Sequence, residues 1–257
     1  MKDLLETDKI EFEENGYIIK NVLADNENFK SIAEKLKNDL VEILKKKDHQ
    51  HLGGYKSGNL NISPGEYGKE ILSILNKLNF QKYFNFLTSE NINNYKIIYG
   101  GNLNFKNSKN QFFHTDGSWN PRMIVLNIAT TEINFDNGPL EVIEKSHKKN
   151  LSYLNFLFES FFLKKKKIEL KFGDILIREH RLWHRGTKNK SKNHREMLGI
   201  IFLKSSEINN NSNENNNLYL HSNIFGTSKR EKFKEFIFLK LRFILFFYKI
   251  LISFRKK

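Results

Sequence analysis

Hydrophobic positions in the first third of the chain recur at the spacing of amphipathic α-helices. Between residues 29 and 44, apolar side chains return every three or four positions and form one stripe. Asp25 or Asn28 can cap the first turn, because a short polar side chain accepts a hydrogen bond from a free backbone N–H there. This segment therefore predicts a helix that buries one face.

Two further segments complete a predicted helical layer. Residues 63–66, Ser-Pro-Gly-Glu, have the capping-box pattern with proline in the first turn, and apolar positions continue through residues 71–78. Residues 80–87 favour a third, shorter helix. We therefore expect N-terminal flanking helices within residues 25–90.

After residue 94 the pattern changes to short apolar runs separated by glycines and polar residues, which is typical of β-strands. Gly100 and Gly101 predict a bulge or bend between the first two runs. Many short strands with glycine turns indicate a sandwich or barrel, so the predicted fold class is α+β with a mainly β core over residues 94–207. The predicted strands are 95–99, 102–105, 123–129, 141–143, 168–172, 175–178 and 197–203.

Length and composition divide the chain into three parts. With 257 residues, of which 39% are hydrophobic, the chain suits one domain with a full core, which the pattern places at residues 1–207. Residues 208–228 include an Asn-rich tract that cannot bury apolar surface, and we expect a loop or linker there. Residues 229–257 predict a basic, phenylalanine-rich C-terminal tail helix.

The tail also accounts for most of the net charge. It holds ten Lys or Arg and two Glu, so eight of the fourteen excess positive charges lie there. A nucleic-acid-binding domain would spread its basic residues along a groove with interleaved aromatic residues, so nucleic acid is not the expected partner.

The longest uninterrupted apolar run in the tail, residues 243–248, is too short to span a bilayer. The tail either makes peripheral contact with a membrane or packs on the body, and the sequence leaves both open.

The chain contains no cysteine, which excludes disulfides and thiolate metal sites and fits a reducing compartment. The first residues lack the apolar run of a secretory signal. We therefore expect a cytoplasmic protein.

The strongest chemical candidate is the segment His114-Thr115-Asp116. Side chains at i and i+2 of a strand point to the same face, so His114 and Asp116 can bind one ion together. His184, on another strand-like segment, can supply a third ligand. Two neutral imidazoles and one carboxylate suit Fe(II) and leave coordination positions open. Isolated histidines are more often ordinary core or surface residues, so the surrounding sequence decides.

Five short segments follow one another around these residues: QFFHTDG at 111–117, NGPLEVI at 137–143, SHK at 146–148, GDILI at 173–177 and LWHRG at 182–186. Their content and order resemble the phytanoyl-CoA dioxygenase family of Fe(II)/2-oxoglutarate-dependent oxygenases. The likeness covers roughly residues 10–204, including the opening at residues 12–17. It implies a double-stranded β-helix (jelly roll, cupin-like), which agrees with the strand pattern.

The resemblance implies that His114, Asp116 and His184 hold Fe(II), with 2-oxoglutarate and O2 as cosubstrates. Arg195 follows His184 by eleven residues, the offset at which family members carry an arginine that binds 2-oxoglutarate. A guanidinium fork matches a carboxylate with two parallel hydrogen bonds. Residues 186–194 predict a hairpin loop that returns Arg195 toward the metal.

Asn127 is a further candidate for cosubstrate contact, because family members place a residue that lines the cosubstrate pocket at this position. It lies in an apolar run, so it needs a hydrogen-bond partner if buried, and a structural hydrogen bond is an equally good reading. The weaker candidates near the pocket are Asn102, Asn104, His147, His180, Arg181, Arg185 and the loop at 53–61.

The implied activity is hydroxylation of an unactivated C–H bond in a small-molecule or lipid-like substrate, with release of succinate and CO2. Asp116 favours hydroxylation, because related halogenases replace this carboxylate with a small residue. One alternative is a non-catalytic jelly-roll binding or membrane-peripheral module. The other, a nucleic-acid dealkylating dioxygenase, usually carries a second arginine six residues after the first, where this chain has Ile201. The sequence names neither the substrate nor the oligomeric state.

Overall fold

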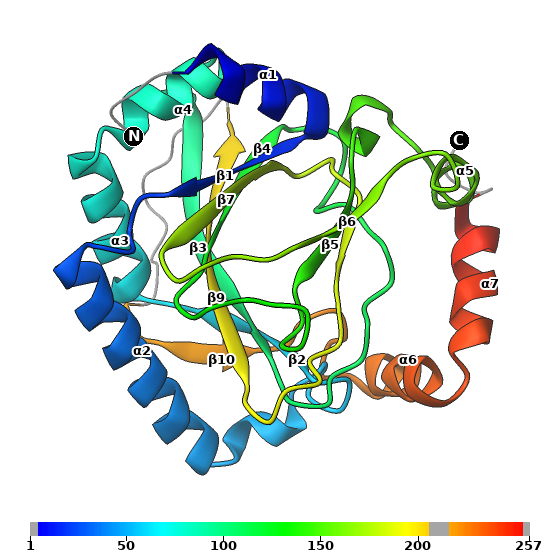
Figure 1. Ribbon diagram of the computed structural model, residues 1–257. Helices are drawn as coiled ribbons and strands as arrows, with labels where there is room; N and C mark the ends of the chain where they lie inside the picture. The colour runs from blue at the N-terminus through cyan, green and yellow to red at the C-terminus, as the bar shows by residue number, and fades with distance from the viewer. Residues whose placement is uncertain (1–4, 206–215, 254–257) are drawn as a thin grey trace.

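Two antiparallel sheets form the core of the protein, as the computed structural model of residues 5–205 and 216–253 shows (Figure 1). The larger sheet has the order β1-β7-β4-β9-β3-β2-β10, and the smaller has the order β6-β5-β8. Residues of both sheets meet in one buried cluster, so the fold is the expected jelly roll. The strands are β1 (Tyr17–Asn21), β2 (Asn59–Ser63), β3 (Tyr95–Asn104), β4 (Met123–Ile128), β5 (Leu140–Ile143), β6 (Lys165–Ile168), β7 (Asp174–Glu179), β8 (His184–Gly186), β9 (Arg195–Lys204) and β10 (Tyr219–His221).

Helices border the two sides of this core (Figure 1). The N-terminal helices α1 (Glu6–Asn15), α2 (Glu27–Lys45), α3 (Glu66–Lys77) and α4 (Phe80–Thr88) lie on one side. On the other side lie α5 (Tyr153–Glu159), α6 (Lys229–Lys240) and α7 (Arg242–Ser253). The apolar faces of α2, α3 and α4 join the larger sheet in the main hydrophobic cluster.

Alternation along the central strands separates this core from a cavity on the other face of the sheet. In β4, Ile124 and Leu126 belong to the main core, whereas Val125 and Asn127 line the cavity. In β7, Ile177 belongs to the core and the next residue, Arg178, lines the cavity. The two-residue period of a strand therefore sets which residues can take part in a site.

The predicted helices α2, α3 and α4 are confirmed, but their starts differ from the expectation. Asn26 caps α2, with its side chain accepting a hydrogen bond from the Phe29 N–H, so neither Asp25 nor Asn28 is the cap. The capping box at residues 63–66 is wrong, because Ser63 ends strand β2. The first N–H of α3 bonds instead to the carbonyl of Asn216, a tertiary contact that local sequence does not reveal.

Two strand predictions also need correction. Residues 95–104 form one continuous strand without a bulge, in which Gly100 pairs with Gly199 of β9. The strand expected at 168–172 is instead β6, which ends at Ile168 and includes three exposed lysines. Pairing with β5 stabilises β6 despite its charged composition.

The C-terminal segment contains two helices where one was expected, because the chain turns at Leu241 between α6 and α7. Residues 219–221 of the expected linker form β10, while residues 206–215, most of the Asn-rich tract, lie outside the described residues. Within the described ranges, no helix is long and apolar enough to cross a bilayer.

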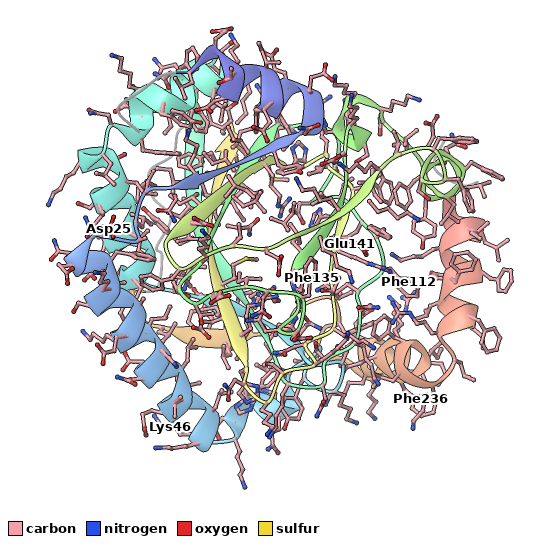
Figure 2. The ribbon with its side chains drawn as sticks, in the orientation of Figure 1. Asp25, Lys46, Phe112, Phe135, Glu141 and Phe236 are labelled. Carbon is pink, nitrogen blue, oxygen red and sulfur yellow. The ribbon has the colours of Figure 1, made fainter. Side chains whose placement is uncertain are left out.

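The inner side of α6 and α7 packs on the segment that precedes His114. The Arg242 guanidinium lies between the rings of Phe112 and Phe238, at 4.5 and 4.6 Å, and donates to the Asn110 carbonyl at 2.7 Å. Lys249 lies 4.9 Å from the ring of Phe112. Figure 2 shows Phe112 on the side of the core that faces these helices.

Phe84 should be a major source of stability, because its fully buried ring contacts the rings of Phe80, Tyr95 and Phe202. We expect Phe84→Ala to lower the free energy of unfolding by about 3–5 kcal/mol in a urea titration. Phe162→Ala, at a side chain that is 88% exposed, should change it by less than about 0.5 kcal/mol. Similar losses in the two variants would contradict this assignment of the core.

Candidate metal centre

Backbone hydrogen bonds join the His114–Asp116 segment to the residues around His184. His114 and His184 exchange two N–H···O=C bonds of 2.9 Å each, as an isolated antiparallel bridge. On one side of this bridge the Gln111 N–H donates to the Gly186 carbonyl at 2.9 Å, and on the other the Asp116 N–H donates to the His180 carbonyl at 3.0 Å. This ladder places three potential ligands together, although His114 and His184 are seventy residues apart in sequence.

The ligand atoms of His114, Asp116 and His184 all lie within 4.8 Å of one another, close enough to hold one metal ion. The Nδ1 atoms of His114 and His184 lie 2.9 and 2.8 Å from the carbonyl oxygens of Phe112 and Leu182. Such contacts make Nδ1 the N–H donor and leave Nε2 free for a metal. The two Nε2 atoms lie 3.9 and 3.5 Å from Asp116 Oδ1.

Arg178 binds the other oxygen of Asp116, and sequence reasoning missed this residue. Its Nη2 donates to Asp116 Oδ2 at 2.6 Å, and its Nε donates to Asn127 Oδ1 at 2.9 Å. Among the described residues, its Nη1 has no hydrogen-bond partner and is buried. The signal available in the sequence was an arginine within an apolar strand. This strand pairs with the strand that carries the buried amide of Asn127.

The surroundings favour the protonation states that bind a metal. About a third of the side chains of His114 and Asp116 is exposed, 34% and 33%, and both line the cavity rather than the outer surface. Burial lowers the pKa of His114, and lowers the pKa of His184 to about 3, so both imidazoles are neutral at neutral pH. Burial alone would raise the pKa of Asp116, but Arg178 and the two histidines outweigh it and hold that pKa below its usual range.

Arg195 is fully buried and lines the same cavity. Its Nη2 donates to the Gly138 carbonyl at 2.8 Å, while its Nε and Nη1 have no partner among the described residues. Burial lowers the pKa of Arg195 to about 10, so the guanidinium stays charged at neutral pH. Two unsatisfied, charged N–H groups in a cavity fit an anionic ligand such as a carboxylate.

Glycine at position 138 makes this arrangement possible. Gly138 has a positive φ of 86°, and a Cβ atom there would lie 2.3 Å from Asn104 Nδ2. The backbone can therefore turn its carbonyl toward Arg195 only without a side chain.

The expected hairpin between His184 and Arg195 is wrong. Strand β8 pairs with β5 in the smaller sheet, whereas β9 pairs with β3 and β4 in the larger. The intervening residues therefore cross from one sheet to the other. Arg195 reaches the cavity because the two sheets face each other, not because its strand folds back on that of His184.

The cavity has a volume of about 480 Å³, and its lining includes His114, Asp116, Arg178, His184 and Arg195. Of the described residues that line it, Asp116 is the only acidic one. A larger hollow of about 610 Å³ lies between α2 and the loops near residues 134 and 192, but it contains none of these residues.

The remaining candidates divide between the cavity and other contacts. Asn127, Asn102 and Asn61 of the 53–61 loop line the cavity, whereas Asn104 donates to the Thr187 carbonyl and does not. The expectation for His147 is wrong, because its ring lies against Gly16 and Glu13. Three others make structural contacts: His180 bonds to Met123 and Ser118, Arg181 to Trp119, and Arg185 to Glu141.

Comparisons with known proteins agree with this geometry. The model of the family described as phytanoyl-CoA dioxygenase (PhyH) matches residues 73–197, which include all three potential ligands and Arg195. No curated protein matches the chain.

Several solved structures have a similar fold at low identity. The non-haem α-ketoglutarate-dependent carbocyclase SnoK from nogalamycin biosynthesis has a TM-score of 0.60 at 13% identity, over 86% of this chain and 98% of its own. The epimerase SnoN, in complex with Fe3+, α-ketoglutarate and nogalamycin RO, has a TM-score of 0.61 at 10% identity, over 78% and 84%. EctD from S. alaskensis with bound Fe has a TM-score of 0.59 at 15% identity, over 79% and 78%.

The geometry predicts that the metal-free protein binds one divalent cation per chain. In a Mn(II) titration followed by calorimetry, alanine at His114, Asp116 or His184 should weaken binding by on the order of 100-fold or more, because removing a residue one shell further out costs 10- to 100-fold. His221→Ala is the matched control, since His221 lines the same cavity outside the group of three. Unchanged affinity in all three alanine variants would exclude this centre.

Proposed function

Because this chain belongs to the phytanoyl-CoA dioxygenase family, whose members are 2-oxoglutarate-dependent non-haem iron oxygenases, we propose that it hydroxylates a C–H bond of a small-molecule substrate and releases succinate and CO2. The observation that carries the proposal is that a potential metal site and a potential carboxylate-binding site line the same cavity. A His-Asp-His set with the composition of an Fe(II) site faces the same space as a buried arginine with two unsatisfied N–H groups.

His114, Asp116 and His184 would hold Fe(II) through two Nε2 atoms and Asp116 Oδ1. The donor set suits this ion, since it is nitrogen-rich, contains no thiolate and has its ligand atoms within 4.8 Å of one another. The backbone carbonyls of Phe112 and Leu182 fix the ring orientations. Arg178 occupies Asp116 Oδ2, which leaves a single carboxylate oxygen for the metal.

Arg195 would bind the distal carboxylate of 2-oxoglutarate. The buried guanidinium already has one hydrogen bond to Gly138, so a carboxylate would satisfy the groups that the protein leaves unpaired. Asn127 lines the cavity but gives its carbonyl oxygen to Arg178, so its contribution to cosubstrate binding would come through its amide N–H groups.

When bound, the iron and 2-oxoglutarate would supply the oxidising power, using O2. The chain supplies orientation: the ladder between residues 111–116 and 180–186 fixes the ligands, and Arg195 fixes the cosubstrate. Asp116 retains the carboxylate ligand that halogenases lack, which supports hydroxylation. The printed activities of SnoK and SnoN are carbocyclisation and epimerisation, so the same fold serves several outcomes and the product must be measured.

The direct test is anaerobic addition of Fe(II) and 2-oxoglutarate to the metal-free protein, followed by visible spectroscopy for the charge-transfer band of the chelate. The wild type should show the band. Arg195→Gln should weaken 2-oxoglutarate binding by roughly 30-fold or more, since loss of a buried charge pair costs about 2 kcal/mol or more. Arg195→Lys should recover only part of this loss, because lysine lacks the fork.

The Arg185→Gln variant provides the control, because Arg185 follows the ligand His184 but its side chain pairs with Glu141 outside the cavity. A wild type without the band, or a band that survives Asp116→Ala undiminished, would contradict the proposal.

We further propose that one surface of the protein contacts an anionic membrane. Of 17 exposed large hydrophobic side chains among the described residues, 11 lie at residues 158–162 or in the α6–α7 segment, and we call these the aromatic face. Helix α7 contacts both α5 and α6, so these residues lie near one another. Figure 2 shows Phe236 of this group at the outer edge of the molecule.

Exposed basic residues accompany the aromatic face. Residues 164–167 and Lys229, Arg230, Lys232 and Lys240 are all exposed, while Glu235 is buried and Glu231 pairs with Lys234. Apolar side chains beside an excess of lysine and arginine suit the interface of a bilayer that contains anionic lipids. Packing of Arg242 and Lys249 on the body leaves the outer side of α7 free for this contact.

Sedimentation with vesicles tests the aromatic face. The wild type should bind vesicles that contain phosphatidylserine more strongly than vesicles of phosphatidylcholine alone. The double variant Phe243→Asp/Phe247→Asp should lose most of this binding, because two charges replace exposed rings. Phe135→Asp, at an exposed ring outside the face, should bind normally. If the wild type binds no vesicles but forms a dimer that the double variant loses, the face is an interface between copies.

A further inference from the structure

Arg178 gives the cavity more positive charge than the proposed iron and cosubstrate neutralise. The charges of Fe(II), Asp116 and Arg195 and the two negative charges of 2-oxoglutarate sum to zero, because a histidine that binds a metal does so as a neutral imidazole. Arg178 then remains as a surplus cation. Its side chain is only 5% exposed, so water screens this charge poorly.

Among the described residues, no other acidic side chain is placed to balance Arg178. Asp116 is the only acidic residue in the part of the cavity lining that the structure describes. The acids on the strands around it make contacts elsewhere: Glu179 pairs with Arg122, Glu141 pairs with Arg185, and Glu196 faces the separate hollow beside α2. Within residues 5–205 and 216–253, the positive charge of Arg178 in the loaded site therefore has no counter-charge, and an anionic ligand can supply one.

The guanidinium of Arg178 also has a free hydrogen-bonding group. Nη2 is used by Asp116 and Nε by Asn127, whereas the buried Nη1 has no partner among the described residues. An unsatisfied N–H on a buried charged group costs free energy that a ligand oxygen would recover. Asp116 and Asn127 hold the side chain from two directions, so this N–H is fixed before any ligand binds.

The cross-strand neighbours of Arg178 on β4 and β9 are apolar. Val125 lies directly opposite Arg178 on β4, and Ile201 of β9 lies opposite Val125 in the same register. All three line the cavity. A ligand that places an anionic oxygen at Arg178 would thus place the atoms next to it against hydrocarbon.

We infer that the substrate carries a carboxylate or another oxyanion on an apolar body, and that Arg178 binds this group and determines specificity. The inference rests on the proposed function and narrows its substrate class. Arg195 binds the cosubstrate anion, and Arg178 binds the substrate anion. Asp116 would then contact both the metal and Arg178, and so would fix where the substrate anion lies relative to the iron.

Benzoate and benzamide provide a matched pair of probes, since they share a ring and differ in charge. Their dissociation constants are measured by anaerobic equilibrium dialysis on the wild-type complex with Fe(II) and saturating 2-oxoglutarate. We expect benzoate to bind at least about 10-fold more tightly than benzamide, equivalent to one charge-assisted hydrogen bond. The charge-transfer band, recorded in the same samples, reports that metal and cosubstrate are in place.

Measured at concentrations of Fe(II) and 2-oxoglutarate at which each variant shows the complete band, Arg178→Gln should lose the preference for benzoate, whereas Arg178→Lys should retain part of it. An arginine that only positions Asp116 would leave the ratio of the two probes unchanged in both variants. The inference is overturned if the wild type binds both probes equally or binds neither. It is also overturned if the preference for benzoate survives Arg178→Gln. If Arg178→Gln does not fold, the ratio of the two dissociation constants is compared between the wild type and Arg178→Lys instead. An unchanged ratio then overturns the inference.

The two proposals fail in different ways. A wild type without the charge-transfer band removes the proposed function, and this inference with it. A wild type with the band but without discrimination between the probes leaves the oxygenase standing and removes only the anionic substrate.

Discussion

The site depends on the reciprocal backbone hydrogen bonds between His114 and His184. Neither residue lies in a long strand: β8 has three residues, and the His114 segment contributes only an isolated bridge. Without this pairing, nothing local would hold an imidazole from each of two distant segments at one point. The contacts of Gln111 with Gly186 and of Asp116 with His180 extend the pairing on both sides, so the ligand side chains inherit their positions from the backbone.

Much of the fold was accessible from the sequence because its pattern is periodic. The stripe in α2 packs against the larger sheet. The apolar runs of β4, β7 and β9 have one face in the main core with these helices and the other face toward the cavity. Apart from the cap of α2, the features that were predicted wrongly are mainly those decided by partners distant in sequence. The start of α3 depends on Asn216, β6 exists because β5 pairs with it, and β8 and β9 belong to different sheets.

The candidate site shows the same division. The spacing of His114 and Asp116 follows from strand geometry, and the resemblance to a family supplied His184 and Arg195, which the structure brings to one cavity. Arg178 was missed because the residue ends an apolar run and its role depends on register. The pairing of β7 with β4 brings Arg178 within hydrogen-bonding distance of Asn127, and Arg178 also donates to Asp116. The prediction for His147 was wrong for a different reason. The residue belongs to a family motif, but the motif does not fix the direction in which its ring points.

Gly100 and Gly199 pair across β3 and β9, and both line the cavity. A Cβ atom at Gly100 would have its nearest neighbour 4.0 Å away, and one at Gly199 would have it 3.6 Å away, so neither position requires glycine on steric grounds. Part of the space for substrate therefore exists because these two residues have no side chain, and not because the backbone bends away. Small residues introduced there would reshape the floor of the cavity while the metal ligands keep their places. Substitutions at these two glycines are therefore a way for the substrate space of this scaffold to change while the segments that carry His114, Asp116 and His184 stay the same.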